Sequence, residues 1–387
     1  MKKILFLTFI LFWACKETPK KNTQITNNVV KQKEKFDALP IKYAKGFTIE
    51  KHEKITVVKV NAPWPSANKT FTYALISRED FKTITLDASK YDAVIPIPVK
   101  RMVATSTTHI PSIEALGIEN TLIGFPGTDY ISSKPIREKI EAGKVKDLGL
   151  NESLNTEVLI NLEPDLVMGF TVEGENKTYE NIINSGTPVV YNGDWVEATP
   201  LGKAEWIKFF GAFFNKQKAA DSIFNSIAKS YNQAKELASK AQKTPSVLSG
   251  SMFKDIWYAP AGESWVAHFL KDANANYIWK DSFGSGSLSL NFESVLAKAK
   301  TTDYWIGPGQ FTSYNQLQES NIHYTQFDAY KNKNIYTYSL TAGATGGLLY
   351  YELAPNRPDL VLKDIIHILH PEILSDYNPV FFKPLKP

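Results

Sequence analysis

The chain of 387 residues contains a single cysteine and only four arginines. One cysteine cannot form an intramolecular disulfide, so hydrophobic cores must hold the folded part together. Nucleic-acid binding proteins concentrate basic side chains on one surface. Here the net charge is +4 and the arginines, Arg78, Arg101, Arg137 and Arg357, are far apart in the sequence. We therefore expect no nucleic-acid partner.

Signatures of catalysis are also missing from the sequence. There is no Walker motif, no HExxH motif and no pair of cysteines. The glycine- and serine-rich residues 284–289 lack the second glycine that a nucleophile elbow requires. We therefore expect that the protein is not an enzyme.

The N-terminus has the pattern of a secretory signal. Lys2 and Lys3 precede an apolar run over residues 4–14, which is too short to span a bilayer as a helix. Cys15 follows a small residue, Ala14, and resembles the lipid-modified cysteine of bacterial lipoproteins. We expect residues 1–15 to be a lipoprotein signal peptide that ends at this cysteine, and the mature protein to be lipid-anchored in the cell envelope. The alternative is an ordinary cleaved signal that contains an incidental cysteine.

Residues 16–45 are rich in Lys, Asn, Thr, Gln and Glu and poor in apolar residues. This composition favours a flexible, solvated tether that holds the folded protein away from the membrane. The Cys15-Lys16-Glu17 start is similar to the charged signals that send some Bacteroidetes lipoproteins to the cell surface. Periplasm-facing and surface-exposed locations therefore both stay open.

A pattern of short strands alternating with helices begins near residue 94. We expect an N-terminal lobe over residues 46–200, in which a parallel sheet is covered by helices on both faces. Three strands are predicted first, over residues 54–60, 70–77 and 94–105. Ligands bind beyond the carboxyl ends of the strands in such sheets. The expected ligand-binding loops are residues 106–109, 125–130, 170–173 and 191–195.

A long uninterrupted helix is predicted over residues 215–242. Asn215 can cap its N-terminus and Pro245 ends the run. At 1.5 Å per residue, such a helix is about 35–40 Å long. Within residues 201–243 we therefore place a rigid helix that joins two lobes. Its larger apolar side chains recur mostly at steps of three and four residues: Ile223, Phe224, Ile227, Tyr231 and Leu237.

The second lobe, expected over residues 244–387, repeats a pattern found in the first. In each lobe Asn-x-Glu opens a helix, and an aspartate then leads a buried strand that ends in glycine. The glutamates are Glu157 and Glu293. Each has a local explanation, because a carboxylate in the first turn of a helix is stabilised by the exposed amides there.

Three segments, residues 101–117, 148–167 and 357–371, resemble the substrate-binding proteins that serve ABC importers of ferric siderophores, haem and cobalamin. The resemblance covers about residues 95–375. It implies two Rossmann-like α/β lobes joined by a single long α-helix that hinges little, with the ligand in the cleft between them. It also implies a monomer whose Glu157 and Glu293 dock onto arginines of the importer permease.

Aromatic residues are common in the expected cleft loops, and flat rings suit a macrocycle or an aryl chelate. The scarcity of arginine favours a neutral or weakly charged ligand, namely a hydroxamate-type iron chelate, a corrinoid or haem. No separate cofactor and no protein-bound metal are expected. His109 could ligate a metal centre in the ligand, or could simply be a polar residue where a helix begins. The expected ligand-binding residues are His109, Tyr130, Trp195, Trp257, Tyr258, Trp265, Tyr338 and Arg357.

The first hypothesis is therefore a membrane-anchored protein that captures a siderophore-type iron complex and delivers it to an ABC importer, with a cobalamin- or haem-binding protein as the alternative. A zinc- or manganese-binding relative would need several histidines and carboxylates that converge in the cleft, and the six histidines are scattered. A surface lipoprotein hydrolase would need two carboxylates with different pKa values in one pocket.

Overall fold

The computed structural model describes residues 37–65, 67–172, 174 and 176–387. The expected signal peptide, Cys15 and most of the expected tether lie outside these residues. These residues form one compact unit. None of the helices in the described ranges is long and apolar enough to cross a bilayer.

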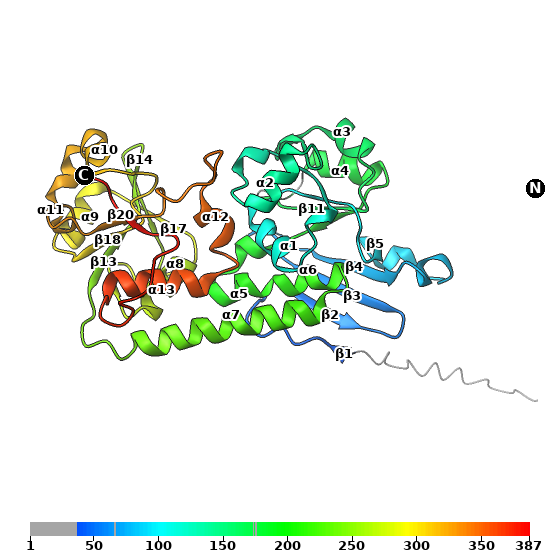
Figure 1. Cartoon of the computed structure of the whole chain (residues 1–387), viewed down its shortest axis with the longest axis horizontal. Coiled ribbons are helices and arrows are strands. Elements are labelled where there is room, and N and C mark those ends of the chain that lie inside the picture. Colours follow the sequence, from blue (N-terminus) through cyan, green and yellow to red (C-terminus); the bar gives the residue numbers. More distant parts are fainter. Residues whose placement is uncertain (1–36, 66, 173, 175) are drawn as a thin grey trace, which may run out of the picture. The chain divides into compact units, whose positions relative to one another are not determined.

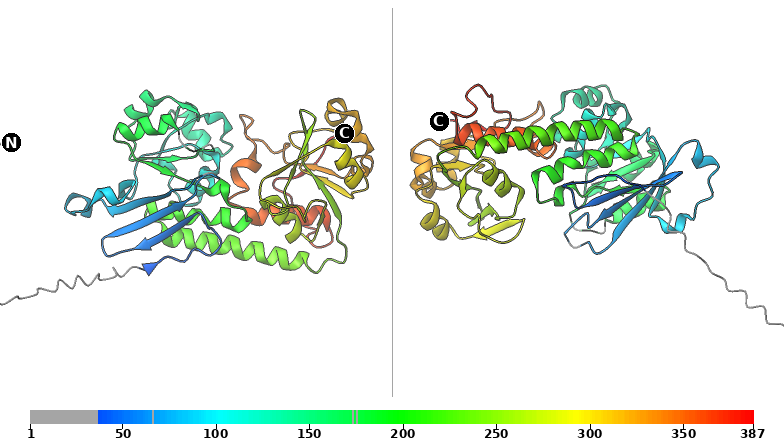
Figure 2. Two further views of the ribbon diagram at one scale, coloured as in Figure 1. Left: turned by 180° about the vertical axis from the view of Figure 1, so that it is seen from behind. Right: turned by 90° about the horizontal axis from the view of Figure 1, so that it is seen from below.

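A five-stranded sheet precedes the two lobes. Its strands are β1 (Asp37–Ala38), β2 (Phe47–Lys51), β3 (Ile55–Asn61), β4 (Thr70–Ser77) and β5 (Ala93–Ile97), and they lie in that order. All neighbours are antiparallel except β4 and β5. Figures 1 and 2 show this sheet beside the N-terminal lobe and away from the C-terminal lobe.

The expectation of a tether that extends to residue 45 is wrong for its last residues. Glu205 accepts hydrogen bonds from the backbone N–H groups of Lys42, Tyr43 and Ala44 at 2.6–3.0 Å. Glu197 accepts from Lys45 and Gly46 at 2.8 Å. The polar composition of residues 42–46 does not indicate that they are ordered. The carboxylates that hold them lie more than 150 residues away in the sequence.

The N-terminal lobe contains a parallel five-stranded sheet in the order β12-β11-β6-β7-β8. Four α-helices belong to this lobe. The strands are β6 (Met102–Ala104), β7 (Leu122–Phe125), β8 (Lys146–Asp147), β11 (Leu166–Gly169) and β12 (Val189–Tyr191), and β9 (Gly149–Leu150) pairs with β10 (Ser153–Leu154) apart from them. The helices are α1 (Ile110–Ala115), α2 (Lys134–Glu141), α3 (Thr156–Asn161) and α4 (Lys177–Asn184).

The single strand predicted over residues 94–105 is two strands in two different sheets. β5 ends at Ile97, and β6 begins at Met102. Pro98 lies between them and has no N–H group to donate to a sheet ladder. Val99 instead donates its N–H to the carbonyl of Phe213.

The C-terminal lobe repeats the architecture with a sheet in the order β16-β13-β18-β19-β20, in which only the β19–β20 pair is antiparallel. A separate antiparallel sheet, β14-β15-β17, lies beside it. The strands are β13 (Ser246–Ser249), β14 (Ser251–Phe253), β15 (Ile256–Pro260), β16 (Asn276–Tyr277), β17 (Ser287–Leu290), β18 (Tyr304–Ile306), β19 (Ile335–Thr337) and β20 (Lys383–Pro384). The helices are α8 (Trp265–Asp272), α9 (Phe292–Ala299), α10 (Tyr314–Ser320), α11 (Asp328–Lys331), α12 (Leu349–Leu353) and α13 (Pro358–Leu369).

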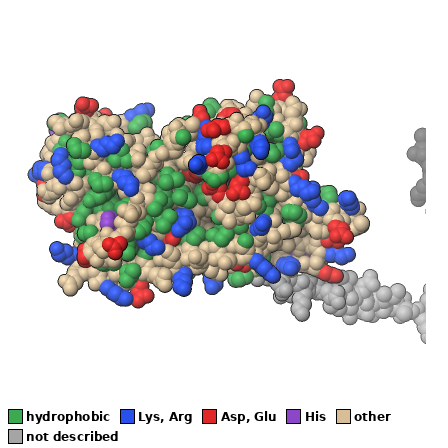
Figure 3. Space-filling view, viewed as in Figure 1, with side chains coloured by type: hydrophobic (Ala, Val, Ile, Leu, Met, Phe, Trp, Pro, Cys, Tyr) green, Lys and Arg blue, Asp and Glu red, His purple; other side chains and the backbone are tan. Residues whose placement is uncertain are grey.

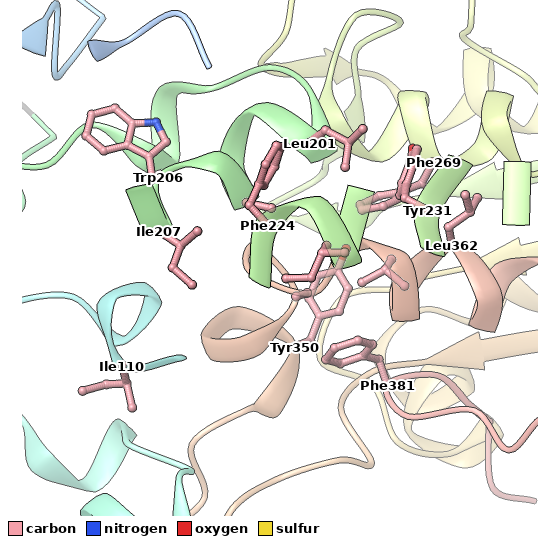
Figure 4. Close-up of a cluster of buried hydrophobic side chains, with 14 of the residues drawn as sticks. Ile110, Leu201, Trp206, Ile207, Phe224, Tyr231, Phe269, Tyr350, Leu362 and Phe381 are labelled. Atoms are coloured by element: carbon pink, nitrogen blue, oxygen red, sulfur yellow. The ribbon is translucent and has the colours of Figure 1, made fainter. Parts of the chain in front are cut away.

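The chain passes from one lobe to the other through α7 (Gln217–Ala238), which confirms the predicted fold class (Figure 1). With 22 residues, α7 is about 33 Å long. It packs against α13 and α6 (Ile207–Phe213), and α5 (Pro200–Glu205) lies next to it. Figure 4 shows Phe224 and Tyr231 of this helix among Leu201, Phe269 and Leu362.

Two details of the helix prediction are wrong. Asn215 does not cap α7, because its backbone is left-handed (φ 55°) and the helix begins after Lys216 without a side-chain cap. Leu237 does not join the buried face and is 42% exposed. Ala234 and Ala238 continue the buried face through the last turn of α7, and Leu237 lies outside that face.

A second element bridges the lobes. We call residues 341–357, which include α12, the strap. It follows β19 and leads into α13, both in the C-terminal lobe, yet α12 packs against α1 and the turn before it in the N-terminal lobe. A Cβ atom at Gly347 would lie 2.2 Å from the carbonyl oxygen of Tyr130, so only glycine permits this approach. Gly347 is therefore an interlobe contact.

Hydrogen bonds tie the strap to the N-terminal lobe. The Glu352 carboxylate accepts from the backbone N–H groups of Ser132 at 2.6 Å and Ser133 at 3.0 Å. Asn356 donates to the Thr108 carbonyl at 2.9 Å and accepts from the Ser112 hydroxyl at 2.7 Å. The strap therefore adds a second connection between the lobes to the one along α7.

The Glu352 contact predicts a pH dependence of stability. Burial raises the pKa of Glu352 from 4.5 to about 7. The nearby Glu114 carboxylate also raises this pKa, whereas the hydrogen bond from Ser132 lowers it. The folded state therefore holds a proton that the unfolded state releases, and this contribution to the free energy of unfolding is lost as the pH rises from about 4.5 to about 7. In the wild type we expect the free energy of unfolding to decline by on the order of 2 kcal/mol over this range because of Glu352. Glu352→Gln should remove this decline, as measured by urea unfolding at several pH values.

The control for this measurement is Glu319→Gln, which changes an exposed glutamate on α10. It should leave the pH profile of the wild type unaltered. Parallel profiles for wild type and Glu352→Gln would contradict the prediction.

Candidate functional site

A cleft of about 660 Å³ lies where the carboxyl ends of the C-terminal strands face the N-terminal lobe. The C-terminal side of the cleft is lined by residues at or just after the ends of β13, β18 and β19, namely Ser249, Ile306 and Tyr338. Tyr258 and Trp265 also line this side. Its N-terminal side contains Pro65, residues 195–198 and Lys203. Figure 3 shows hydrophobic side chains gathered over the C-terminal lobe beside the hollow between the lobes.

A smaller cavity of about 370 Å³ lies at the carboxyl ends of the N-terminal strands. Residues 105–107, 125–127 and 149–152, Tyr130 and Phe170 line it. Tyr351 of the strap lines both cavities, so we treat them as two halves of one cleft. Four loops were expected to bind ligand, and each contributes at least one lining residue to one half or the other.

Stacked and edge-on rings form the wall of the larger half. Tyr338 stacks on Tyr350 at 4.6 Å between ring centroids, with an angle of 12° between the planes. Trp265 approaches Tyr350 at 5.7 Å. The hydroxyl oxygens of Tyr338 and Tyr351 are 3.0 Å apart. These rings hold each other in place before any ligand arrives, which lowers the entropy lost on binding.

Five of the eight expected ligand-binding residues line the cleft. Trp195, Tyr258, Trp265 and Tyr338 line the larger half, and Tyr130, which is 66% exposed, lines the smaller half. Their placement is consistent with ligand contact, and their roles remain proposals.

Two of the other three are buried away from the cleft. Trp257 has no exposed surface and packs against Trp305 and Tyr324 in the core of the C-terminal lobe. Successive side chains of a strand point to opposite faces, so on β15 Tyr258 faces the cleft and Trp257 the core. His109 is also completely buried, against the Phe210 ring.

Arg357 lies in a different cavity, of about 600 Å³, between α1, α7 and the start of α13. Its guanidinium makes two hydrogen bonds, at 2.9 and 3.0 Å, to the buried Asp359 carboxylate. The prediction that Arg357 lines the cleft with the other ligand-binding residues is therefore wrong. Arg357 comes just before α13, and its guanidinium already donates to the Asp359 carboxylate two residues further along the chain.

None of the four arginines lines the cleft as the structure describes it. The other three hold backbone or carboxylate oxygens elsewhere: Arg78 bonds Asp165, Arg101 bonds the Leu162 carbonyl, and Arg137 bonds the Thr128 carbonyl. The charged side chains that line the two halves are Glu152, Glu197 and Lys203. Glu197 is occupied by the Lys45 and Gly46 amides, so the cleft has few groups to recognise a highly charged ligand.

Several buried polar groups of the N-terminal lobe lack a hydrogen-bond partner. Within the described residues, the buried side-chain atoms without a partner are both ring nitrogens of His109, Asn192 Nδ2, Asp194 Oδ1 and Trp195 Nε1. Burial lowers the pKa of His109 to about 4, although Asp194 opposes the shift. Buried polar groups normally find partners, so these five atoms are exceptions in the N-terminal lobe.

Lys203 connects the turn at Asp194 and Trp195 with the opposite lobe. Its ammonium donates to the carbonyls of Asp194 at 3.1 Å and Trp195 at 2.7 Å. Burial lowers its pKa to about 8, against the pull of Asp194 and Glu197. The same ammonium lies 5.4 Å from the centre of the Trp265 ring in the C-terminal lobe, within cation–π range.

The two repeated glutamates have matching local structures. Asn155 caps α3 by accepting from the Val158 N–H at 3.0 Å, and Asn291 caps α9 by accepting from the Ser294 N–H at 2.8 Å. Glu157 and Glu293 occupy the first turns of these helices, and both are exposed. The local structure of the repeat is therefore confirmed, and both carboxylates are available to a partner.

Sequence reasoning missed Pro65, Phe170, Lys203 and Tyr351 as cleft residues. Phe170 directly follows a buried strand in an expected ligand loop, so the rule that predicted the loops could have found it. Pro65 and Tyr351 had no such signal, because they reach the cleft from the N-terminal sheet and from the strap.

Two α/β lobes joined by one long helix, with an apolar cleft at the carboxyl ends of both sheets, define a bilobal solute-binding protein. The profile of the periplasmic binding protein family matches residues 102–340, and the chain belongs to this family. Membership gives the chain a binding role rather than a catalytic one. The N-terminal sheet and the strap lie outside the matched residues.

Relatives in Methanocaldococcus jannaschii include two uncharacterized lipoproteins. One uncharacterized lipoprotein is 28% identical over 298 residues, which are 75% of this chain and 69% of that protein. A second uncharacterized lipoprotein is 24% identical, and the similarity covers 97% of each chain. The second match therefore includes the N-terminal region that the family profile omits.

Solved structures share the fold. A possible iron-binding periplasmic protein of Staphylococcus epidermidis has a TM-score of 0.55 at 18% identity, covering 70% of this chain and 99% of its own. The periplasmic haem-binding protein of Vibrio cholerae has a TM-score of 0.53 at 18% identity, covering 68% and 98%. The vitamin B12-binding protein of the same organism has a TM-score of 0.50 at 11% identity, covering 72% and 99%. At these identities the likeness establishes the fold alone.

The zinc- or manganese-binding alternative needs a converging set of ligands. Within the described residues, no three His, Cys, Asp or Glu side chains come together in a group that could hold a metal ion. The donor set of the cleft therefore gives that alternative no support.

Burial of His109 predicts acid sensitivity. Because the folded-state pKa lies near 4 and the ordinary value is 6.5, the unfolded state takes up a proton first as the pH falls. The stability contributed by neutral His109 is present above about pH 6.5 and is lost as the pH falls towards 4. Between about pH 6.5 and pH 4 the free energy of unfolding should fall in the wild type and in His109→Phe. We expect the fall to be smaller in His109→Phe, by on the order of 2 kcal/mol, as measured by urea unfolding.

The same substitution at the exposed His323 is the control and should follow the wild-type profile. If His109→Phe shows the full acid-induced loss, the source of the loss lies elsewhere in the chain.

Proposed function

We propose that this protein is a lipid-anchored solute-binding protein that captures a siderophore-type iron complex and delivers it to an ABC importer. The observation that carries the proposal is the character of the cleft, which is lined by aromatic rings and contains none of the chain's four arginines. The anchor would be Cys15, consistent with the lipoprotein relatives.

The size and lining of the cleft favour a bulky ligand of low charge. The larger half alone, at about 660 Å³, falls within the range of ordinary small-molecule pockets. Tyr258, Tyr351 and Phe253, which line it, are 39–63% exposed and offer ring surface for burial. A strongly anionic chelate would lack arginine partners here, whereas a hydroxamate-type chelate needs few.

Haem or a corrinoid is the second candidate. The same exposed rings offer flat surfaces to a macrocycle, and the fold is shared with proteins named for binding haem and vitamin B12. Ferric hydroxamates, haem and corrinoids have distinct visible absorption bands, so the spectrum of protein purified from its native host separates them. A colourless protein that binds none of the three would count against the proposal.

Loss of an exposed cleft ring should weaken binding without unfolding the protein. Tyr258→Ala removes a phenol that lines the cleft and is 39% exposed. We expect affinity for the ligand identified by its spectrum to fall roughly tenfold, because stacking and burial of one ring contribute about 1–2 kcal/mol. Quenching of tryptophan fluorescence during titration measures this.

Phe81→Ala is the matched control, because Phe81 is 44% exposed and follows β4 in the N-terminal sheet, outside the cleft. Its affinity should equal that of wild type. Equal affinities for all three proteins would place the ligand elsewhere.

For delivery, we propose that Glu157 and Glu293 bind cationic sockets on the importer permease. Each lies in an exposed first turn, one in each lobe, and α7 with the strap fixes the distance between the lobes. Two anions at a fixed span recognise two cationic sites only when both lobes are correctly placed.

The double variant Glu157→Ala, Glu293→Ala should abolish importer-dependent uptake while the affinity of the purified protein for its ligand stays unchanged. Uptake of labelled ligand by cells and titration of the purified variant measure the two quantities. Glu180→Ala is the control, because Glu180 is an exposed glutamate in the first turn of α4, in the same lobe as Glu157. A loss of ligand affinity in the double variant would argue against a docking role.

A further inference from the structure

Tyr351 occupies the junction between the two halves of the cleft. It lines both cavities and is 48% exposed. It belongs to the strap, which lies beyond the residues that match the family profile. Nothing in the sequence pattern marks this residue as a ligand contact, so its place depends on how the strap is held.

The neighbours of Tyr351 hold it from both sides. Tyr350, immediately before it, is buried in the C-terminal lobe, where it stacks on Tyr338 and contacts Phe381 and Phe382. Glu352, immediately after it, is 2% exposed and bonds the Ser132 and Ser133 amides of the N-terminal lobe. Tyr351 is therefore a cleft residue with one sequence neighbour fixed to each lobe.

The phenol of Tyr351 has one defined partner. Its hydroxyl oxygen is 3.0 Å from that of Tyr338. Each phenol has one O–H to donate, and one bond between the two uses only one of these protons. Burial raises the pKa of Tyr338, so this phenol keeps its proton at neutral pH. The pair therefore always retains one O–H that can donate to a third group.

We propose that Tyr338 donates to Tyr351 and that Tyr351 directs its own O–H at an acceptor oxygen on the edge of the ligand. Tyr351 is the more exposed of the two phenols and the one that lines both halves. The ligand class is a large complex with a peripheral carbonyl, hydroxamate or carboxylate oxygen. This deepens the proposed function and rests on it.

The proposal also assigns Glu352 a positioning role. Its carboxylate holds the residue after Tyr351 against the N-terminal lobe, so a ligand bonded to Tyr351 contacts a segment that both lobes hold. Binding at this junction would favour one relative placement of the lobes, because the strap connects them.

The test uses the full-length mature protein and three probes: ferrioxamine B, haemin and cyanocobalamin. Each is titrated against wild type, Tyr351→Phe, Tyr338→Phe and the double variant. Phenylalanine keeps the ring and removes only the hydroxyl. We expect Tyr351→Phe to weaken binding of the preferred probe about three- to tenfold, the effect of one hydrogen bond.

The coupling between the two phenols gives a second readout. If Tyr338 acts through Tyr351, Tyr338→Phe should have no further effect once Tyr351 is already Phe, so the double variant should bind as Tyr351→Phe does. A general loss of packing would instead give additive effects. Tyr330→Phe is the control, because its hydroxyl also bonds within the chain, to Gln318 and Tyr314, but away from the cleft.

The outcomes separate the two proposals. If wild type binds a probe and Tyr351→Phe binds it equally well, or if the two effects add, the inference about Tyr351 is overturned while the proposed function stands. If wild type binds none of the three probes, the proposed function falls, and this inference falls with it.

Discussion

The buried face of α7 is the interaction on which the rest of the structure depends. Phe224, Ile227 and Tyr231 of this helix pack into a hydrophobic cluster that includes residues of both lobes. Burial of these large side chains is favourable by several kcal/mol. It also holds α13 and α6 against α7. The lobes are therefore parts of one packed body, which suits a cleft with a settled shape and little hinging.

Buried carboxylates secure the irregular segments that the hydrophobic core cannot hold. Glu205 and Glu197 bind the amides of residues 42–46, Glu352 binds those at the start of α2, and Asp364 binds the amides of residues 380–382. Each satisfies backbone N–H groups that would otherwise be left without partners on burial. This arrangement draws the N-terminal segment, the strap and the C-terminal segment onto the lobes.

The cleft combines fixed rings with sparse charge. Tyr338, Tyr350 and Trp265 pack on one another before any ligand is present, and the arginines are bonded elsewhere. Binding would then depend on burial of apolar surface and a few hydrogen bonds. Lys203 and the strap each contact both lobes at this cleft, so occupancy of the site and placement of the lobes are physically connected.

Local periodicity and capping were enough to predict the two α/β lobes, the joining helix and the matched glutamates from the amino-acid sequence. The same reading of the sequence predicted five residues that line the cleft: Tyr130, Trp195, Tyr258, Trp265 and Tyr338. The burial of Trp257 and His109, the pairing of Arg357 with Asp359 and the position of Tyr351 in the cleft depend on the packing of the whole chain. Those outcomes depend on contacts between residues far apart in the chain, or on which face of a strand meets the core, and neither is contained in a local pattern.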